Sequence, residues 1–327
     1  MNAPVLKVPQ ARDEAVREAG PLLPLAHRLP APIHFALAGG GSHGAIQWGL
    51  LQALEETDIR PAALIGTSVG ALTGAVVAED PASAVNRLTY IWTQLELKFL
   101  VGGLGLTKQL LLNALQPGLV DNDNERGSLE AMLRARDFAD LAVPFAAVTT
   151  DLASGRATVI DSGPLIPALL ASSAIPGVLP PVSIDGRWYV DGLASANLPA
   201  VQAVQRGAGS VVVLDTGSRD AQEVSTSATR IVARLSIALA ASQRRAQLAE
   251  AGEQVPVVLL PTPNDLGGTL DFGETVSNAA QAYSMCRDFL GRLTLAGSDH
   301  LTPGVYADAS FPGLGQADAH LVRTVGP

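Results

Sequence analysis

Two consecutive units, each made of an apolar strand, a glycine-containing loop and a helix, constrain the fold of this chain most. The first joins an apolar run at residues 33–38 to a loop at 39–44, and residues at helical spacing follow. The second joins a run at 62–65 to a loop at 66–70 and another helix. This alternation is typical of parallel strands with right-handed crossovers. We therefore predict an α/β fold, a three-layer α/β/α sandwich with a mostly parallel central sheet.

The remainder of the chain continues this pattern. An Asp-Gly pair at 185–186, between two strand-like runs, predicts a β-hairpin. We expect a proline-punctuated flexible arm at 1–31, one domain at 32–296 and an irregular tail at 297–327. Further strands are predicted at 144–149, 157–160, 182–184, 187–190, 210–214 and 255–260, and further helices at 164–173, 226–251 and 277–293.

Charge and cysteine content exclude several function classes. The net charge is −9 and no Lys/Arg-rich run occurs, which argues against nucleic-acid binding and against purely electrostatic docking on anionic membranes. Cys286 is the only cysteine, so no disulfide within the chain can form. The five histidines form no cluster with metal-ligand spacing, and we expect neither a metal nor a cofactor.

The first residues contain acids and prolines but no apolar core of a signal peptide. No run of about 18 apolar residues predicts a membrane-spanning helix. We therefore expect a cytoplasmic protein, with peripheral membrane contact left open. The sequence indicates no oligomeric state.

The loop at 66–70 matches the pattern G-x-S-x-G around Ser68. A serine on a sharp strand-to-helix turn exposes its hydroxyl, and glycines such as Gly66 and Gly70 are needed where bulkier residues would clash. The following amide, that of Val69, lies at a helix N-terminus, where it can stabilise an oxyanion. Because the pattern also arises by chance, the strand before it and the helix after it carry the interpretation. Ser68 is the candidate nucleophile.

The loop at 39–44 matches G-x-G-x-x-G, which alone is a weak signal for dinucleotide binding. That function requires an acidic residue at the end of the second strand, whereas Asp58 precedes this strand. No Lys-Ser/Thr pair follows the loop, so it is not a P-loop. Adjacent parallel strands bring both loops to one sheet edge. The glycine loop at 39–44 could therefore supply oxyanion donors beside Ser68, namely Gly39, Gly40 and Gly41.

A serine nucleophile needs a base. None of the histidines lies in a strong strand-end context, whereas Asp191 directly follows the predicted strand 187–190. A carboxylate serves as a base only if desolvation raises its proton affinity. From the residues alone, a turn or a helix cap remains the other interpretation of Asp191.

Taken together, the motifs resemble those of the patatin-like phospholipase family. The chain shows G-G-G-S-H-G at 39–44, G-T-S-V-G at 66–70, A-S-S-A-I-P-G at 171–177 and Y-V-D-G at 189–192, in the family's order. The segment T-D-L-A-S-G at 150–155 also resembles a family segment. The resemblance implies a patatin-like fold and a lipid acyl hydrolase in which Ser68 is the nucleophile and Asp191 the base, without a histidine. It also implies Gly40 and Gly41 as main oxyanion donors, and His43, Gly44, Gly66, Gly70 and Gly192 as supporting motif residues.

Two residues depart from the family pattern. His43 stands where the family usually has Arg or Lys, and Leu193 stands where a small residue is usual. The Leu- and Gly-rich segment at 95–119 could cap the site or pack as one more core helix. The alternatives to a lipid ester hydrolase are an acyltransferase or thioesterase on the same fold, and a non-catalytic lipid-binding protein. Thr67 stands where transferases with a partner histidine have His.

Overall fold

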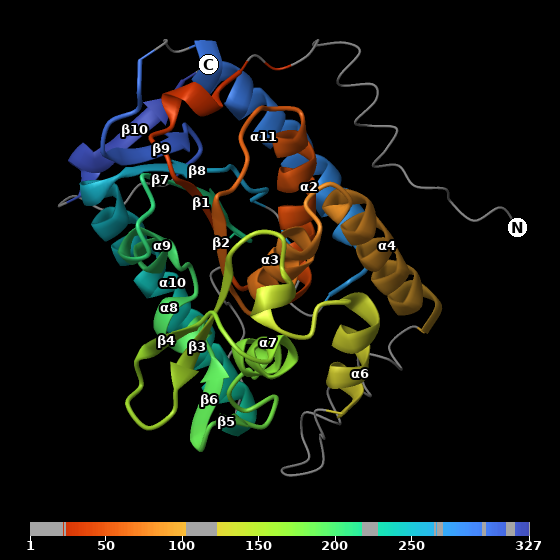
Figure 1. Cartoon of the computed structure of the whole chain (residues 1–327). Coiled ribbons are helices and arrows are strands. Elements are labelled where there is room, and N and C mark those ends of the chain that lie inside the picture. The colour runs from red at the N-terminus through yellow and green to blue at the C-terminus, as the bar shows by residue number, and fades with distance from the viewer. Residues whose placement is uncertain are drawn as a thin grey trace, which may run out of the picture.

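A computed structural model describes residues 22, 24–102, 123–217, 228–264, 266, 271–295, 299–311 and 318–326. These residues form a sheet of ten strands with helices packed on both of its faces (Figure 1). The predicted α/β class with a mostly parallel central sheet is confirmed. The strands are β1 (Ile33–Leu37), β2 (Ala63–Thr67), β3 (Phe145–Asp151), β4 (Ala157–Ile160), β5 (Val182–Ile184), β6 (Arg187–Asp191), β7 (Ser210–Leu214), β8 (Pro256–Leu259), β9 (Gly304–Asp308) and β10 (Val322–Val325).

Helices connect most of these strands. Short 3-10 turns include η1 (Ala26–Arg28) and η2 (Gly41–His43). The α-helices are α2 (Gly44–Glu55), α3 (Val69–Glu79), α4 (Ala84–Gly102), α6 (Asp123–Met132), α7 (Leu165–Ser173), α8 (Leu193–Ala196), α9 (Ala200–Gln205), α10 (Ala228–Gln254) and α11 (Thr275–Leu295). None of the described helices combines the length and the apolar character needed to cross a bilayer.

The strand order is β10-β9-β8-β7-β1-β2-β3-β6-β5, and β4 pairs with β3. Pairing is parallel from β10 to β3 and antiparallel among β3, β4, β5 and β6. Every residue of β1 and β7 is buried, as expected for central parallel strands covered on both faces. One core contains Phe35, Trp48 and Tyr283, where α2 packs on α11; the other contains Ile65 and Val213, beneath α8, α9 and α10.

The pairings of β3 bring β2 and β6 together. Thr149 and Thr150 each pair with both β4 and β6, so β4 and β6 lie along opposite edges of β3. Val148 pairs with both β2 and β4, so β2 lies on the edge that β6 also occupies. The last residue of β2, Thr67, pairs with Val148 of β3. The last residue of β6, Asp191, pairs with the next residue of β3, Thr149. Because β6 runs antiparallel to β3, the ends of β2 and β6 therefore meet.

The hairpin of β5 and β6 follows the sequence prediction. Asp185 and Gly186 form its turn, with φ values of 49° and 76°. Two successive residues of positive φ define the turn type whose twist matches that of paired strands. The hairpin thereby sets the direction of β6, whose C-terminal end points toward the end of β2.

Two predicted boundaries are wrong. The flexible arm was expected to reach residue 31, but Leu25 is fully buried and its amide donates to Asp58 Oδ1 at 2.6 Å. The tail was expected to be irregular, yet β9 and β10 extend the parallel sheet, with Val305 and Ala307 buried in the core. Most of the predicted arm, at 1–21 and 23, lies outside the described residues, as does most of the Leu- and Gly-rich segment, at 103–119.

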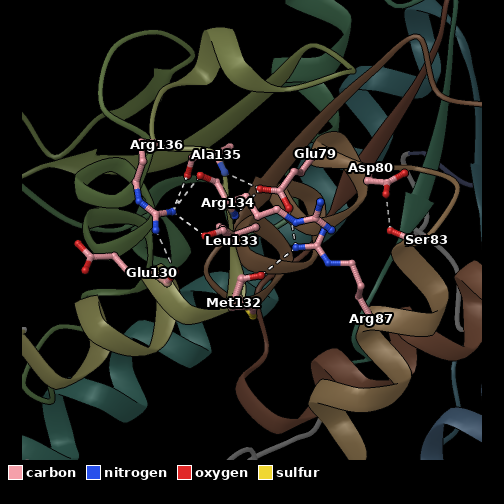
Figure 2. A network of polar contacts seen from close by, with 10 residues as sticks. All are labelled: Glu79, Asp80, Ser83, Arg87, Glu130, Met132, Leu133, Arg134, Ala135 and Arg136. Atoms are coloured by element: carbon pink, nitrogen blue, oxygen red, sulfur yellow. Dashed lines mark hydrogen bonds and ion pairs between the residues drawn. The ribbon is translucent and has the colours of Figure 1, made fainter.

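A polar network fixes the far end of α3 (Figure 2). Glu79 accepts hydrogen bonds from the amides of Arg134 and Ala135, both at 2.6 Å, and pairs with Arg87 of α4 at 2.6 Å. Arg87 also donates to the carbonyl of Met132 at the end of α6. The helix that starts after Ser68 is therefore anchored at its C-terminus to α4 and to the segment after α6.

Candidate active site

Ser68 occupies a strained turn between β2 and α3. Its φ of 55° and ψ of −127° lie outside the regions that non-glycine residues favour, as expected for a serine held on a strand-to-helix elbow. A Cβ placed on Gly70 would lie 2.4 Å from the Leu37 carbonyl oxygen, so only glycine fits there. The amide of Ser68 donates to Ser172 Oγ at 2.9 Å, and Ser172 donates to the Val148 carbonyl at 2.7 Å.

Asp191 is fully buried and held by its backbone on both sides. Its amide donates to the Ala174 carbonyl at 2.9 Å, and its carbonyl accepts from Thr150 Oγ1 at 2.9 Å. Its carboxyl Oδ1 accepts the amide of Leu193 at 2.8 Å. Among the described residues, Oδ2 has no hydrogen-bond partner of normal geometry.

The protonation of Asp191 follows from this burial. Desolvation raises the pKa of its carboxyl group from 3.8 to about 7, while the Leu193 amide and the Ser68 hydroxyl act in the opposite direction. The Ser68 hydroxyl is therefore close enough to stabilise the carboxylate, although no bond of normal geometry reaches Oδ2. A carboxyl group with a pKa near neutrality beside a serine hydroxyl can accept its proton.

The glycine loop after β1 lies directly beside Ser68. A Cβ on Gly39 would lie 3.0 Å from the Cβ of Ser68. The amides of Gly40, Gly41 and Val69 have no hydrogen-bond acceptor within the described parts of the chain. These three donors belong to the two loops that meet at Ser68, and backbone donors without an acceptor are what an oxyanion hole requires.

Gly39 corrects the sequence prediction of four donors. Its amide donates to the Asn197 carbonyl at 3.0 Å, so it is already engaged. Gly39 therefore anchors the glycine loop through this hydrogen bond and does not offer a free N–H group.

The supporting motif residues lie around these groups. His43 ends η2 and is buried. Gly44 opens α2, where a Cβ would lie 2.3 Å from Val69 Cγ2, and a Cβ on Gly66 would lie 2.3 Å from the Gly70 carbonyl oxygen. A Cβ on Gly192 would lie 2.6 Å from the Val148 carbonyl oxygen. The glycines let the elbow and the two loops approach each other.

Three residues that contact this site carry no motif that assigns them a role from the sequence. They are Ser172 at the Ser68 amide, and Asn197 and Thr216 at the Gly39 carbonyl. Ser172 lies in the A-S-S-A-I-P-G segment, which was the one available signal for it. Within the described residues, no group of three or more His, Cys, Asp or Glu side chains could hold a metal ion.

Comparisons with known proteins found both sequence relatives and a solved structure similar to this chain. The chain is 32% identical over 192 residues to patatin-like phospholipase domain-containing protein 7 of Mus musculus, covering 58% of this chain and 14% of that protein. It is 31% identical over 173 residues to an uncharacterized NTE family protein of Mycobacterium tuberculosis, covering 49% of this chain and 42% of that protein. Among solved structures, the crystal structure of VipD from Legionella pneumophila is similar over 80% of this chain and 67% of the VipD chain. The sequence identity is 13% and the TM-score is 0.39.

This chain therefore spans about one seventh of the mouse relative's length and less than half of the mycobacterial one's. The family model described as "Patatin-like phospholipase" matches residues 35–204, more than half of the 327 residues. This range contains the elbow, the glycine loop and Asp191. The chain belongs to the patatin-like phospholipase family.

Proposed function

We propose that this protein is a serine lipid acyl hydrolase of the phospholipase A or esterase type, with Ser68 and Asp191 as a catalytic dyad. One observation carries the proposal: β2 and β6 end against each other on one edge of β3, so a serine on a strained elbow lies beside a buried carboxyl group. The pKa of this carboxyl group, about 7, suits a general base at neutral pH.

In the proposed reaction, Ser68 Oγ attacks the ester carbonyl carbon while Asp191 accepts the hydroxyl proton. The amides of Gly40, Gly41 and Val69 stabilise the oxyanion, each contributing about 3 kcal/mol in the transition state. The tetrahedral intermediate expels the alcohol, which takes the proton from Asp191, and an acyl-serine remains. Water then attacks this acyl group, Asp191 takes a proton from the water, and the proton returns to Ser68 as the fatty acid leaves.

Family membership and the names of the relatives support a lipid substrate. The ester hydrolase assignment adds a finer claim, because the same serine could pass its acyl group to an acceptor other than water. A protein that only binds lipid would retain the fold without the reaction. Lipid esters are presented at interfaces, so peripheral membrane contact belongs to the proposal.

The test is hydrolysis of p-nitrophenyl esters and of a panel of phospholipid vesicles by the wild type and two variants. We expect Ser68→Ala and Asp191→Asn each to lower kcat by at least about 10³-fold with an unchanged circular dichroism spectrum. Matched controls are Ser210→Ala, a buried serine of β7, and Asp161→Asn, an exposed aspartate; both should retain activity.

Full turnover by Ser68→Ala or Asp191→Asn would exclude the role of that residue. Vesicle binding without hydrolysis by the wild type, and without covalent labelling of Ser68 by a fluorophosphonate, would favour the lipid-binding alternative. Labelling of Ser68 together with acyl transfer to an added acceptor in preference to water would favour the transferase.

A further inference from the structure

Two side chains from distant segments donate to one backbone oxygen beside Ser68. The Gly39 carbonyl accepts from Thr216 Oγ1 at 2.7 Å and from Asn197 Nδ2 at 3.2 Å. Thr216 follows β7, and Asn197 follows α8. The Gly39 amide donates to the Asn197 carbonyl, so the residue is held at its nitrogen and at its oxygen.

The peptide bond transmits this constraint to Gly40. The Gly39–Gly40 bond is trans and planar, so its carbonyl and its N–H point in opposite directions. Because the carbonyl is directed at Thr216 and Asn197, the Gly40 N–H is directed away from them. Among the described residues this N–H has no acceptor, and Gly39 lies against the Cβ of Ser68.

Thr216 is itself held firmly. Its side chain is almost completely buried, and a Cβ on Gly40 would lie 2.3 Å from its Oγ1. Its amide donates to Asp215 Oδ1 at 2.9 Å, and Asp215 Oδ2 accepts from Arg244 Nε of α10 at 2.6 Å and pairs with Arg244 Nη2. Arg244 also lies over the ring of Phe311, 5.7 Å from its centroid. An ion pair between Arg244 and the buried carboxylate of Asp215 therefore fixes the segment that carries the hydroxyl group.

We propose that Thr216 and Asn197 are positioning residues that orient the Gly40 N–H toward the substrate oxyanion by clamping the Gly39 carbonyl. This inference rests on the proposed hydrolase function. Neither residue touches the reacting atoms in the proposed reaction; both act through the peptide unit between Gly39 and Gly40. Their effect is expected in the transition state, where the oxyanion forms, and not in substrate binding.

The test compares Thr216→Val, which keeps the branched shape but removes the hydroxyl group, with Thr216→Ser, which keeps the hydroxyl group. We expect Thr216→Val to lower kcat for a p-nitrophenyl ester about 10-fold with KM within about twofold, because removing an oxyanion donor outright costs about 10²- to 10³-fold. Thr216→Ser should restore kcat to within about threefold of the wild type. The midpoint of the pH profile should stay in place in all variants, because Asp191 is not altered.

Thr57→Val is the matched control. Thr57 is buried and donates to the Leu54 carbonyl at 2.7 Å, the same length as the Thr216 bond, at the end of α2. We expect its kcat to equal that of the wild type. If Thr216→Val fails to fold, Asn197→Ala, which removes the longer bond to the same oxygen, carries the test with an expected loss of about threefold in kcat at constant KM.

A kcat of Thr216→Val equal to that of the wild type would overturn the inference. A Thr216→Ser variant as slow as Thr216→Val would also overturn it, because packing of the side chain and not its hydroxyl group would then determine the rate. These outcomes presuppose a wild type whose Ser68 is labelled by a fluorophosphonate and which hydrolyses the ester. A wild type without either property would contradict the proposed function itself.

Discussion

The elbow between β2 and α3 and the hairpin of β5 and β6 deliver the two members of the proposed dyad by different physical means. The elbow holds Ser68 through local backbone strain and through glycines that let α3 approach β1. The hairpin holds Asp191 through long-range pairing, because β6 joins the edge of β3 where β2 ends. The turn of this hairpin, in contrast to the elbow, faces open space at Gly186.

The difference shows where each region tolerates change. At the elbow, a single added carbon atom collides with backbone that cannot move without shifting a central strand. At the hairpin turn, an added carbon atom meets nothing, and only the conformational preference of the residue is at stake. The energetic cost in the hairpin lies at its other end, where Asp191 is buried with no charged partner in the described part of the chain.

The largest effect is expected for Gly70→Ala. Its Cβ would lie 2.4 Å from the Leu37 carbonyl oxygen and 2.6 Å from that of Ala38, so β1 or α3 must shift. We expect a loss of about 4 kcal/mol in the free energy of unfolding, at the high end for overpacking, and loss of Ser68 labelling. Urea denaturation measures the first, and fluorophosphonate labelling the second.

Gly186→Ala is the control for this prediction. It places the same added carbon atom at φ 76° in open space, and the left-handed conformation costs about 1 kcal/mol. Ester hydrolysis should be unaffected. Equal destabilisation by the two substitutions would show that steric contact at the elbow is not what distinguishes the two regions.

The next effect concerns the free energy of burying Asp191. Its pKa of about 7 in the folded state lies above its ordinary value of 3.8, so the folded state favours the protonated form. Its contribution to stability is fully present below about pH 4 and is lost as the pH rises through about 7. At pH 8, Asp191→Asn should be more stable than the wild type by about 4 kcal/mol, the free energy that corresponds to the difference between a pKa of 3.8 and one of about 7.

Urea denaturation of both proteins at pH 5 and pH 8 measures this difference, and ionisations elsewhere cancel between them. The difference in free energy of unfolding between Asp191→Asn and the wild type should be smaller at pH 5 than at pH 8. Asp161→Asn, at an exposed ion pair, is the control and should show only a small dependence on pH. A difference in free energy of unfolding that stays constant or increases toward pH 5 would contradict the raised pKa of the buried Asp191 carboxyl group.

Local patterns made the elbow and most of the sheet predictable from the sequence. Apolar runs next to glycine loops indicate buried parallel strands, and an Asp-Gly pair indicates a hairpin turn. Asp191 as a base followed only from the family resemblance, because a lone aspartate after a strand is more typical of a turn or a helix cap.

The remaining features depend on long-range contacts. The bond of Ser172 to the Ser68 amide spans 104 positions, and that of Thr216 to Gly39 spans 177. Ser and Thr are common residues, and no local pattern marks such partners. The engaged amide of Gly39 was missed for the same reason. The strands β9 and β10 were missed because scattered Gly and Pro hide two short runs that become strands only by long-range pairing, β9 with β8 and β10 with β9.

The most direct test of the account is the pH dependence of the rate at which a fluorophosphonate labels Ser68. If Asp191 is the base, the rate should rise about tenfold per unit of pH below the pKa, reach its half-maximum near pH 7 and level off above it. In Asp191→Asn the rate should be low at every pH, with that step absent. A wild-type profile without a step near neutrality, or an Asp191→Asn variant labelled as fast as the wild type, would contradict the pairing of these two residues.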